Sequence, residues 1–502
     1  MRVFALILFY IGAIATHSAR AEQPARPRQP ATVIVVQDQT ALRAAPKDSA
    51  QQQAVLWQGD VLEVRGTRLD YLQVYDHRRE RAGFVRAAQV RSLATQPEDA
   101  ADLLAVARFL RDTSGAEALG IGYAAAYLEA APAEVLGAGT IAAEAFDAIG
   151  TMADRLARRA STNRIKGNDA ILAAHLEVVA GYGIKFRSFE HDGRMQLCYD
   201  GEASRRVMAL KSGDEQKARA ALVLTRPECV DPDTTPLDRY SLDQWRADVV
   251  ERVPRANLPE YLQNRLRLRS ASIAASLAFE RTRRGESGRE AASLAIAELA
   301  GVNKAELADE DLGAYNDAAM RVGAVRWAAE APRMTAPAGL AIVTAPGQPG
   351  ETCIKLLDKK RDAAHPLLQR CTFGAVWTNS VSTNAYGTAL ALAVQPLDGW
   401  RELWVWHLGG DGWRIDVIPP GNESPGGASL ALGYIEFAGW VPGGRSVLAA
   451  RESRSGGKFT RSFEVLELET LAVQKRADTP QALSLFYRWQ DPAWKRATLS
   501  LR

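Results

Sequence analysis

Apolar and polar residues alternate differently in successive parts of the chain, and three folded regions follow from this pattern. Residues 31–93 show short alternating runs, residues 95–330 show helical spacing, and residues 351–502 return to strand-like alternation. Residues 331–350 are rich in Ala, Pro and Gly, which is typical of a linker. The pattern predicts a multidomain α+β protein with a small β-barrel, an all-α helical array and a β-rich, tryptophan-rich C-terminal domain.

The first region is predicted to consist of short strands separated by glycine turns. Its clearest alternation covers Leu69–Tyr75. A period of two places Leu72 and Val74 on one face of this strand, where they would point into the core. Tyr71 and Tyr75 then lie on the opposite face, either open to a ligand or packed against the helical region.

Signals for helix starts recur through residues 95–330. At six positions a capping residue is followed three residues later by Glu or Gln, an arrangement that satisfies free backbone donors at a helix N-terminus. These pairs are Thr95 and Glu98, Ser114 and Glu117, Ser212 and Glu215, Ser241 and Gln244, Asn257 and Glu260, and Ser287 and Glu290. We expect about eight to ten antiparallel helices, arranged as a bundle or an α-solenoid.

Tryptophan is concentrated in the C-terminal region, where eight of the eleven residues lie between Trp377 and Trp494. Trp404 and Trp406 share one face of a predicted strand. If exposed, they would stack on sugar rings or anchor a partner protein. If buried, they would fill the core of a sheet, a position that favours aromatic residues. Both interpretations stay open here, as do a propeller-like arrangement and stacked antiparallel sheets.

The N-terminus has the pattern of an export signal. Arg2 precedes the apolar run Val3–Ala15, and the small residues Ala19 and Ala21 predict cleavage before Glu22. The alternative is an uncleaved anchor, but the run is shorter than the roughly 20 residues that span a bilayer. Residues 1–21 are therefore predicted to be a signal peptide and residues 22–30 a flexible leader, and the mature protein is expected in the periplasm or secreted.

Charge gives no general argument for nucleic acid or an anionic membrane as partner. The formal net charge is +3, and removal of Arg2 and Arg20 with the signal leaves +1. Arg78, Arg79 and Arg81 occur together in one predicted hairpin, and we interpret them as a solvated turn. No nucleic-acid partner and no membrane span after signal cleavage are expected.

The four cysteines fit an oxidising compartment. They permit three connectivities, and we predict the local one because each pair then falls within one candidate domain. The predicted disulfides are Cys198–Cys229 and Cys353–Cys371. A zinc site is the alternative, but no spacing is C-x-x-C and no histidine lies at ligand spacing. No metal and no cofactor are predicted.

Motifs for catalysis are missing from the sequence, which contains neither H-E-x-x-H nor G-x-S-x-G. One polar cluster, Glu190, His191 and Asp192 with Asp200 and Glu202 near Cys198, has groups that bind a cation or transfer protons. Such a loop is more often solvated and held by its disulfide. We therefore predict no catalytic residue and keep Glu190, His191 and Asp192 as weaker site candidates beside Trp404 and Trp406.

Four segments of residues 31–93 resemble the bacterial SH3 family: Leu42–Pro46, Val55–Asp60, Tyr71–Val74 and Gly83–Val85. The resemblance implies an SH3-like barrel that binds peptides or cell-wall peptides in a groove between loops. Family members usually carry tryptophan where this chain has Tyr71 and Phe84, so the aromatic character is kept. The groove candidates that follow are Tyr71, Tyr75, Phe84 and Trp57.

A second resemblance concerns the C-terminal region. Gly439–Ala450 resembles the core of TolB-like propeller repeats, with departures at Val441 and Gly443. The whole chain is also similar to uncharacterised exported SH3-domain proteins of proteobacteria. Together these features predict a periplasmic binding or scaffold protein of the cell envelope rather than an enzyme. Its predicted partner is a peptide, an envelope protein or a peptidoglycan fragment. The alternative is an envelope hydrolase whose site is assembled between domains.

Overall fold

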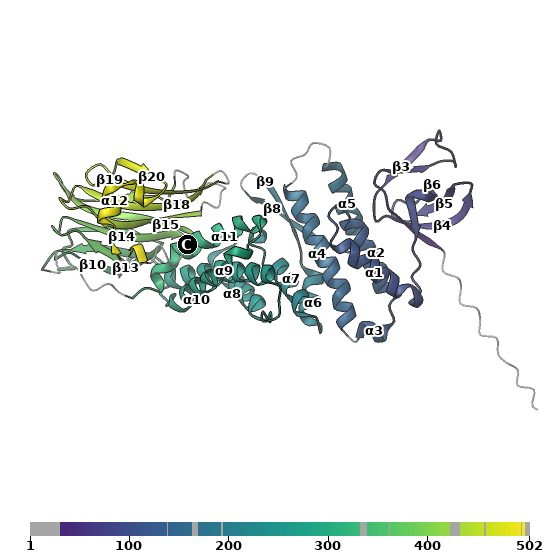
Figure 1. The fold of residues 1–502 in the computed structure, drawn as a ribbon, viewed down its shortest axis with the longest axis horizontal. Helices are drawn as coiled ribbons and strands as arrows, with labels where there is room; N and C mark the ends of the chain where they lie inside the picture. The colour runs from purple at the N-terminus through teal and green to yellow at the C-terminus, as the bar shows by residue number, and fades with distance from the viewer. Residues whose placement is uncertain are drawn as a thin grey trace, which may run out of the picture.

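The molecule is elongated, with a β module at one end, helices in the middle and a larger β domain at the other end (Figure 1). The computed structural model describes residues 31–137, 139–162, 169–191, 194–331, 339–360, 362–421, 432–455, 458–492 and 494–496. The predicted signal peptide and leader lie outside these residues. The mixed α+β architecture expected from the sequence is confirmed. Among the described residues, no helix is both long and apolar enough to cross a membrane.

The N-terminal β module is a seven-stranded antiparallel sheet in the order β3-β2-β6-β5-β4-β1-β7. Its strands are β1 (Thr32–Val35), β2 (Thr40–Arg43), β3 (Gln52–Leu56), β4 (Val61–Arg68), β5 (Tyr71–Asp76), β6 (Arg81–Arg86) and β7 (Val90–Ser92). Val74 is fully buried and Leu72 packs against the same core, on the predicted inner face. The sheet is not closed into the small barrel expected from the sequence, since β3 and β7 are its two edges.

Strand β1 contributes to two different apolar cores. Val33 and Val35 point into the core of the module, whereas Ile34, on the opposite face, packs into a cluster formed by helices. Leu93 joins that same helical cluster. The outer face of β1 is therefore buried against the helical region, while its inner face contributes to the core of the module.

The first half of the helical region packs against this module. Its helices are α1 (Ala100–Arg111), α2 (Glu117–Ala130), α3 (Ala133–Gly137), α4 (Thr140–Thr162), α5 (Asp169–Gly181), α6 (Glu202–Ala209) and α7 (Asp214–Leu224). A hairpin, β8 (Phe186–His191) with β9 (Arg194–Tyr199), interrupts the helices and differs from the predicted all-α region. Phe186, Leu197 and Tyr199 pack on the helical core. The predicted disulfide Cys198–Cys229 is present and ties the hairpin to the segment after α7.

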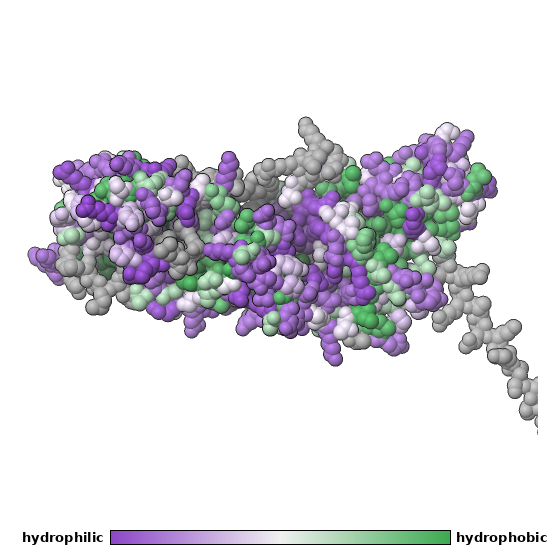
Figure 2. Space-filling view, in the orientation of Figure 1, coloured by the Kyte–Doolittle hydropathy of each residue, from purple (hydrophilic) through white to green (hydrophobic). Residues whose placement is uncertain are grey.

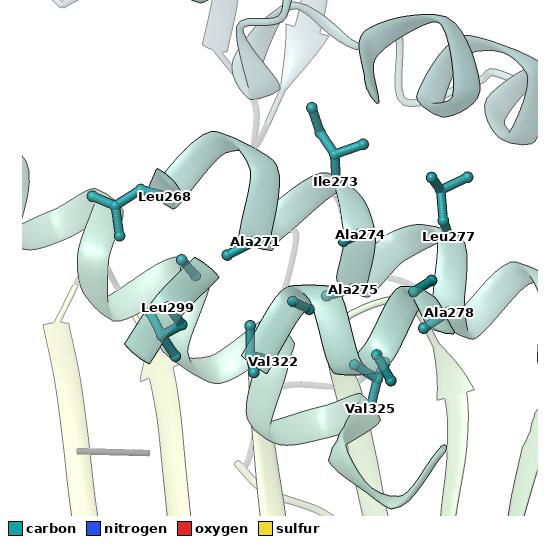
Figure 3. Close-up of a cluster of buried hydrophobic side chains, with 14 of the residues drawn as sticks. Leu268, Ala271, Ile273, Ala274, Ala275, Leu277, Ala278, Leu299, Val322 and Val325 are labelled. Carbon is teal, nitrogen blue, oxygen red and sulfur yellow. The ribbon is translucent and has the colours of Figure 1, made fainter. Parts of the chain in front are cut away.

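The second half contains α8 (Pro236–Glu251), α9 (Glu260–Arg283), α10 (Arg289–Ala300) and α11 (Leu312–Val325). Helix α9 has buried residues from Leu262 to Glu280 and shares one apolar cluster with Leu299 of α10 and Val322 of α11. In Figure 3, Ile273 and Leu277 point to the side away from Val322. The predicted start of a helix at Ser241 is wrong. The helix begins at Pro236, where the Thr235 side chain accepts a hydrogen bond from the Asp238 backbone N–H.

The C-terminal domain consists of two packed sheets and a short helix. A three-stranded sheet contains β10 (Ala341–Pro346), β11 (Thr352–Leu357) and β12 (Leu368–Thr372). An eight-stranded sheet contains β13 (Ala375–Thr383), β14 (Ala389–Leu397), β15 (Trp400–Gly409), β16 (Gly412–Ile418), β17 (Leu432–Trp440), β18 (Ser446–Ser455), β19 (Lys458–Glu467) and β20 (Val473–Ala477). Helix α12 spans Ser484–Trp489, and β10 begins inside the predicted linker. The arrangement is one of stacked sheets, and neither sheet is closed.

Trp404 and Trp406 lie between these two sheets. Trp404 is 4% exposed and Trp406 fully buried, in a cluster with Ile354 and Leu356 of the small sheet. The buried interpretation of this tryptophan face is therefore the correct one. The second predicted disulfide, Cys353–Cys371, joins directly opposed residues of β11 and β12.

A buried ion-pair cluster joins the helices to the large sheet. Glu436 of β17 accepts hydrogen bonds from Arg326, which follows α11, at 2.8 Å and from Arg401 of β15 at 3.0 Å. Arg401 also donates to the backbone oxygen of Gly323 in α11 at 2.7 Å, and Trp494 Nε1 donates to Glu436 at 2.6 Å. These contacts cross the boundary between the helical region and the β domain, so the two are held in a fixed arrangement.

Candidate ligand-binding cleft

A hollow of about 290 Å³ lies where the β module meets helix α5. We call it the junction cleft and define it by its lining residues: Thr32, Gly59, Asp60, Val61, Glu63, Asp76, His77, Arg78, Val178, Gly181 and Tyr182. One wall comes from β1, β4 and the turns of the module, and the other from the last turn of α5. Its residues are brought together from segments about a hundred positions apart.

The close approach of module and helices depends on a glycine. Gly59 has φ +91°, and a Cβ there would lie 2.7 Å from the backbone oxygen of Ala118 in α2. The Gly59 oxygen accepts a hydrogen bond from the Tyr182 hydroxyl at 2.6 Å. Burial raises the pKa of Tyr182, so its phenol stays a donor. The turn before Asp60 is thus fixed against the end of α5.

Polar contacts from α5 hold the module in place. His175 is 2% exposed, and its Nε2 lies 2.7 Å from Asp38 Oδ1 in the turn between β1 and β2. Burial opposes ionisation of Asp38, but contacts with His175 and Gln58 outweigh it and lower the pKa of Asp38. Two residues further along α5, the Glu177 carboxylate accepts a hydrogen bond from Arg78 at 3.0 Å. The cleft is therefore formed before a ligand arrives.

Two buried carboxylates form the floor of the cleft. The side chain of Asp60 is 5% exposed and that of Asp76 is 2% exposed. Arg79 bridges them, donating to Asp76 Oδ2 at 2.8 Å and to Asp60 Oδ2 at 3.1 Å. Burial opposes the charge on Arg79, but these hydrogen bonds outweigh it and raise its pKa. The interpretation of the arginine hairpin as a solvated turn is wrong for Arg79.

The rim of the cleft carries accessible polar and aromatic groups. His77 Nε2 lies 2.7 Å from Glu63 Oε2, and Arg65 donates to Glu63 Oε1 at 3.1 Å. Hydrogen bonds from His77 and Arg65 lower the pKa of Glu63. The Tyr75 ring stands edge-on to the His77 ring at 4.9 Å and beneath the Arg65 guanidinium at 4.1 Å. Tyr75 thus neighbours the cleft without being part of its lining.

The other groove candidates lie elsewhere. Tyr71 is 3% exposed, and its hydroxyl donates to Asp48 at 2.6 Å while Arg86 covers the ring, so it does not line an open groove. Phe84 is half-buried in the middle of β6, and Trp57 packs against the helical core. The structure therefore does not bring the four aromatic candidates together in one groove.

The acidic candidates near Cys198 do not assemble into a described site. Glu190 is exposed at the end of β8, Asp192 lies outside the described residues, and His191 is described only as backbone. Asp200 and Glu202 are used locally, because Asp200 accepts from the Glu202 backbone N–H and Glu202 pairs with Arg205 and Arg206. In this region the carboxylates support the start of α6.

Histidine–carboxylate pairs recur in the fold, at His77, His175, His365 and His407. Across the part of the chain that the structure describes, none of these imidazoles is hydrogen-bonded to a serine, threonine or cysteine. The one group of described residues close enough to hold a metal ion is Glu351, Cys353 and Cys371. Both of its sulfur atoms are in a disulfide, so they are not available as thiolate ligands.

The residues that the sequence analysis missed are Asp60, Glu63, Asp76 and His77. Asp60, Asp76 and His77 stand in or beside turns of the module, whereas Glu63 lies within β4 and has no local signal. Comparisons with protein-family models, with curated proteins and with solved structures found no match. The argument for function therefore rests on the site itself. In the view of Figure 2, hydrophobic atoms gather at the module's end, over α1 and α2, whereas the middle helices are mostly hydrophilic.

Proposed function

We propose that this protein is an exported binding protein of the cell envelope that takes a short peptide, or the peptide part of peptidoglycan, in the junction cleft. The observation that carries the proposal is a preformed two-walled hollow with buried carboxylates at its floor and a His–Glu–Tyr rim. Convergent polar groups in a concave site are the usual mark of a ligand site. The two disulfides and the predicted signal support a location outside the cytoplasm.

The dimensions of the cleft favour part of a chain as ligand. About 290 Å³ is at the low end of the range for small-molecule sites, so the cleft suits one side chain or a chain end. The elongated shape in Figure 1 leaves the β domain at the far end, distant from the bound ligand. A scaffold that holds a wall peptide at one end and a second partner at the other is consistent with this arrangement.

The test is co-sedimentation of the purified protein with peptidoglycan sacculi. Gly181→Leu fills the cleft, because a Cβ at Gly181 meets only Arg78, at 3.8 Å, and leucine favours the helix. Gly137→Leu is the matched control, since Gly137 also ends a helix and its Cβ would meet nothing within 4 Å. We expect Gly181→Leu to abolish pelleting and Gly137→Leu to leave it unchanged.

Two results would overturn the proposal. If the wild-type protein does not pellet with sacculi, or if Gly181→Leu pellets as well as wild type, the cleft is not a wall-peptide site. Release of soluble muropeptides by the wild-type protein would replace it with the second candidate, an envelope hydrolase. That activity should be followed in the same samples by chromatography of the supernatant.

A further inference from the structure

The geometry points to a primary ammonium group as what the junction cleft recognises, carried by a lysine or diamino-acid side chain of the bound peptide. This inference rests on the proposed function and adds the chemical class of the ligand. It is drawn from three features of the cleft: an incompletely bonded carboxylate at the floor, a net negative charge, and an apolar wall.

The carboxylate is that of Asp60. Its Oδ2 accepts hydrogen bonds from the Trp57 backbone N–H at 2.9 Å and from Arg79 at 3.1 Å. Its Oδ1, among the described residues, has only an ion pair with Arg78 Nη1 at 3.5 Å, which is too long for a good hydrogen bond. The Asp60 side chain is 5% exposed, and a carboxylate oxygen without a close donor in such a place gains from a charged donor supplied by a ligand.

The charged groups in and around the cleft carry a net negative charge. Its carboxylates are Asp60, Glu63, Asp76 and Glu177, and its guanidinium groups are Arg65, Arg78 and Arg79. Four negative groups thus face three positive groups, with His77 left out of the count. The arginines already donate to these carboxylates, so an added anion would compete with bonds that exist. An added cation completes the pairing instead.

The arrangement fits an ammonium group better than a metal ion. A metal needs several ligand atoms at close range around one point. Among the described residues, no three carboxylate or imidazole ligands of the cleft lie within 4.8 Å of one another. Ammonium has three donors and no such requirement, and it sits at the end of a flexible aliphatic stem.

The second wall of the cleft suits that stem. Val178 and the small Gly181 of α5 face Val61 of β4 across the hollow, and Val61 is 36% exposed. Methylene groups pack on such apolar surface while the charged head reaches a polar site. A lysine-like side chain would therefore lie along the valines with its ammonium at Asp60 and Glu63.

The experiment compares two probes on the intact protein by isothermal titration calorimetry: the tripeptide Ala–Glu–Lys with its N-terminus acetylated, and the same peptide acetylated on its lysine amine as well. Acetylation of the lysine removes the charge and two donors but keeps the stem. We expect it to weaken binding by at least tenfold. Since only the ligand changes, this comparison does not depend on a variant folding correctly.

A pair of charge-matched variants locates the effect. Glu63→Gln removes one negative charge from the rim, whereas Asp70→Asn removes one from a turn of the same module that does not line the cleft. We expect three- to tenfold weaker binding of the tripeptide with the free lysine amine for Glu63→Gln and no change for Asp70→Asn. Circular dichroism checks that both variants are folded.

The outcomes separate this inference from the proposed function. If the protein pellets with sacculi but binds both tripeptides equally, or binds neither, the ammonium inference is overturned and the wall-binding function stands. Equal effects of Glu63→Gln and Asp70→Asn also overturn it, because they would indicate long-range attraction only. If neither sacculi nor tripeptide binds, the proposed function itself has failed.

Discussion

Replacement of Glu436 by Gln should strongly destabilise the boundary between the helices and the C-terminal domain. Glu436 is 4% exposed and is the shared acceptor for Arg326 and Arg401, which are themselves fully or almost fully buried. Gln keeps the shape of the side chain but removes its charge. Among the described residues, Arg401 would then be left without a counter-ion, and Arg326 would keep only its ion pair with Glu330 at 3.2 Å.

The size of the effect follows from two separate arguments. Arg326 and Arg401 hold the pKa of Glu436 at about 2, against a burial effect that alone would raise it. Relative to an ordinary glutamate this lowering corresponds to roughly 3 kcal/mol of folding free energy. Removing one partner of a buried ion pair costs about 3–5 kcal/mol in other proteins. We therefore expect Glu436→Gln to lose about 3–4 kcal/mol near pH 7.

The measurement is urea unfolding of wild type and variant between pH 7 and pH 2.5. Because the folded-state pKa of Glu436 is depressed, its contribution is complete above the unfolded pKa near 4.5 and is lost as pH falls towards 2. The gap between the two proteins should therefore shrink with acidification. Glu469→Gln, an exposed residue paired with Arg414, is the control and should change stability by less than about 0.5 kcal/mol.

A variant within about 1 kcal/mol of wild type at pH 7 would refute the reasoning, because the buried cluster would then make no net contribution that depends on charge. A gap of constant size from pH 7 to 2.5 would refute it in a different way. It would show that the loss comes from packing around Trp494 and not from ionisation of Glu436.

Three further predictions concern other parts of the fold. Burial raises the pKa of Glu452, whose carboxylate accepts from the Tyr434 hydroxyl at 2.8 Å, to about 8. The free energy of unfolding of the wild type should therefore fall as pH rises from 4.5 to 8. In thermal melts, the stability of Glu452→Gln relative to wild type should rise by up to about 1.4 kcal/mol per pH unit over this range. Joint replacement of Cys353 and Cys371 by Ser should cost about 3 kcal/mol, since the disulfide closes a loop of 18 residues. Ile34→Ala should cost about 2–4 kcal/mol and make the module the first site of limited proteolysis, because Ile34 packs on the helices.

Each of these has a result that contradicts it. A difference between Glu452→Gln and wild type that does not change between pH 5 and 8 would mean that this carboxyl group titrates normally. Free thiols in the unreduced protein would remove the basis of the disulfide prediction. Proteolysis of the Ile34→Ala variant that starts in the C-terminal domain would show that the module does not depend on the helices.

Much of the local structure follows from the sequence because it depends on neighbouring residues. Period-two alternation placed Leu72 and Val74 in the core of the module, and local spacing predicted both disulfides correctly. Capping patterns indicated helices, but the helix start that they predicted at Ser241 is wrong because Ser241 lies inside α8. A stronger start at Thr235 and Pro236 lay six residues earlier, and a capping pair inside a helix has no backbone donors to satisfy.

The candidate site could not be predicted in this way. Tyr71 and Tyr75 alternate correctly, yet only contacts from distant residues decide their exposure: Asp48 and Arg86 cover Tyr71, while Tyr75 stays near the rim. The alternation of a strand gives two faces but does not say which face another domain will cover. Here the helices cover the outer face of β1, which the alternation alone does not indicate.

By itself, the sequence determined the types of element, their approximate order, the disulfide pairing and the expectation of export. Only the tertiary structure decided that Trp406 is core, that Asp60 and Asp76 share one arginine, and that Gly181 faces them across a hollow. The reason is physical. Hydrogen-bonded turns and periodic burial are set by residues within a few positions of each other. A cleft between β4 and α5 depends on how two separately formed surfaces pack, and no local pattern records that.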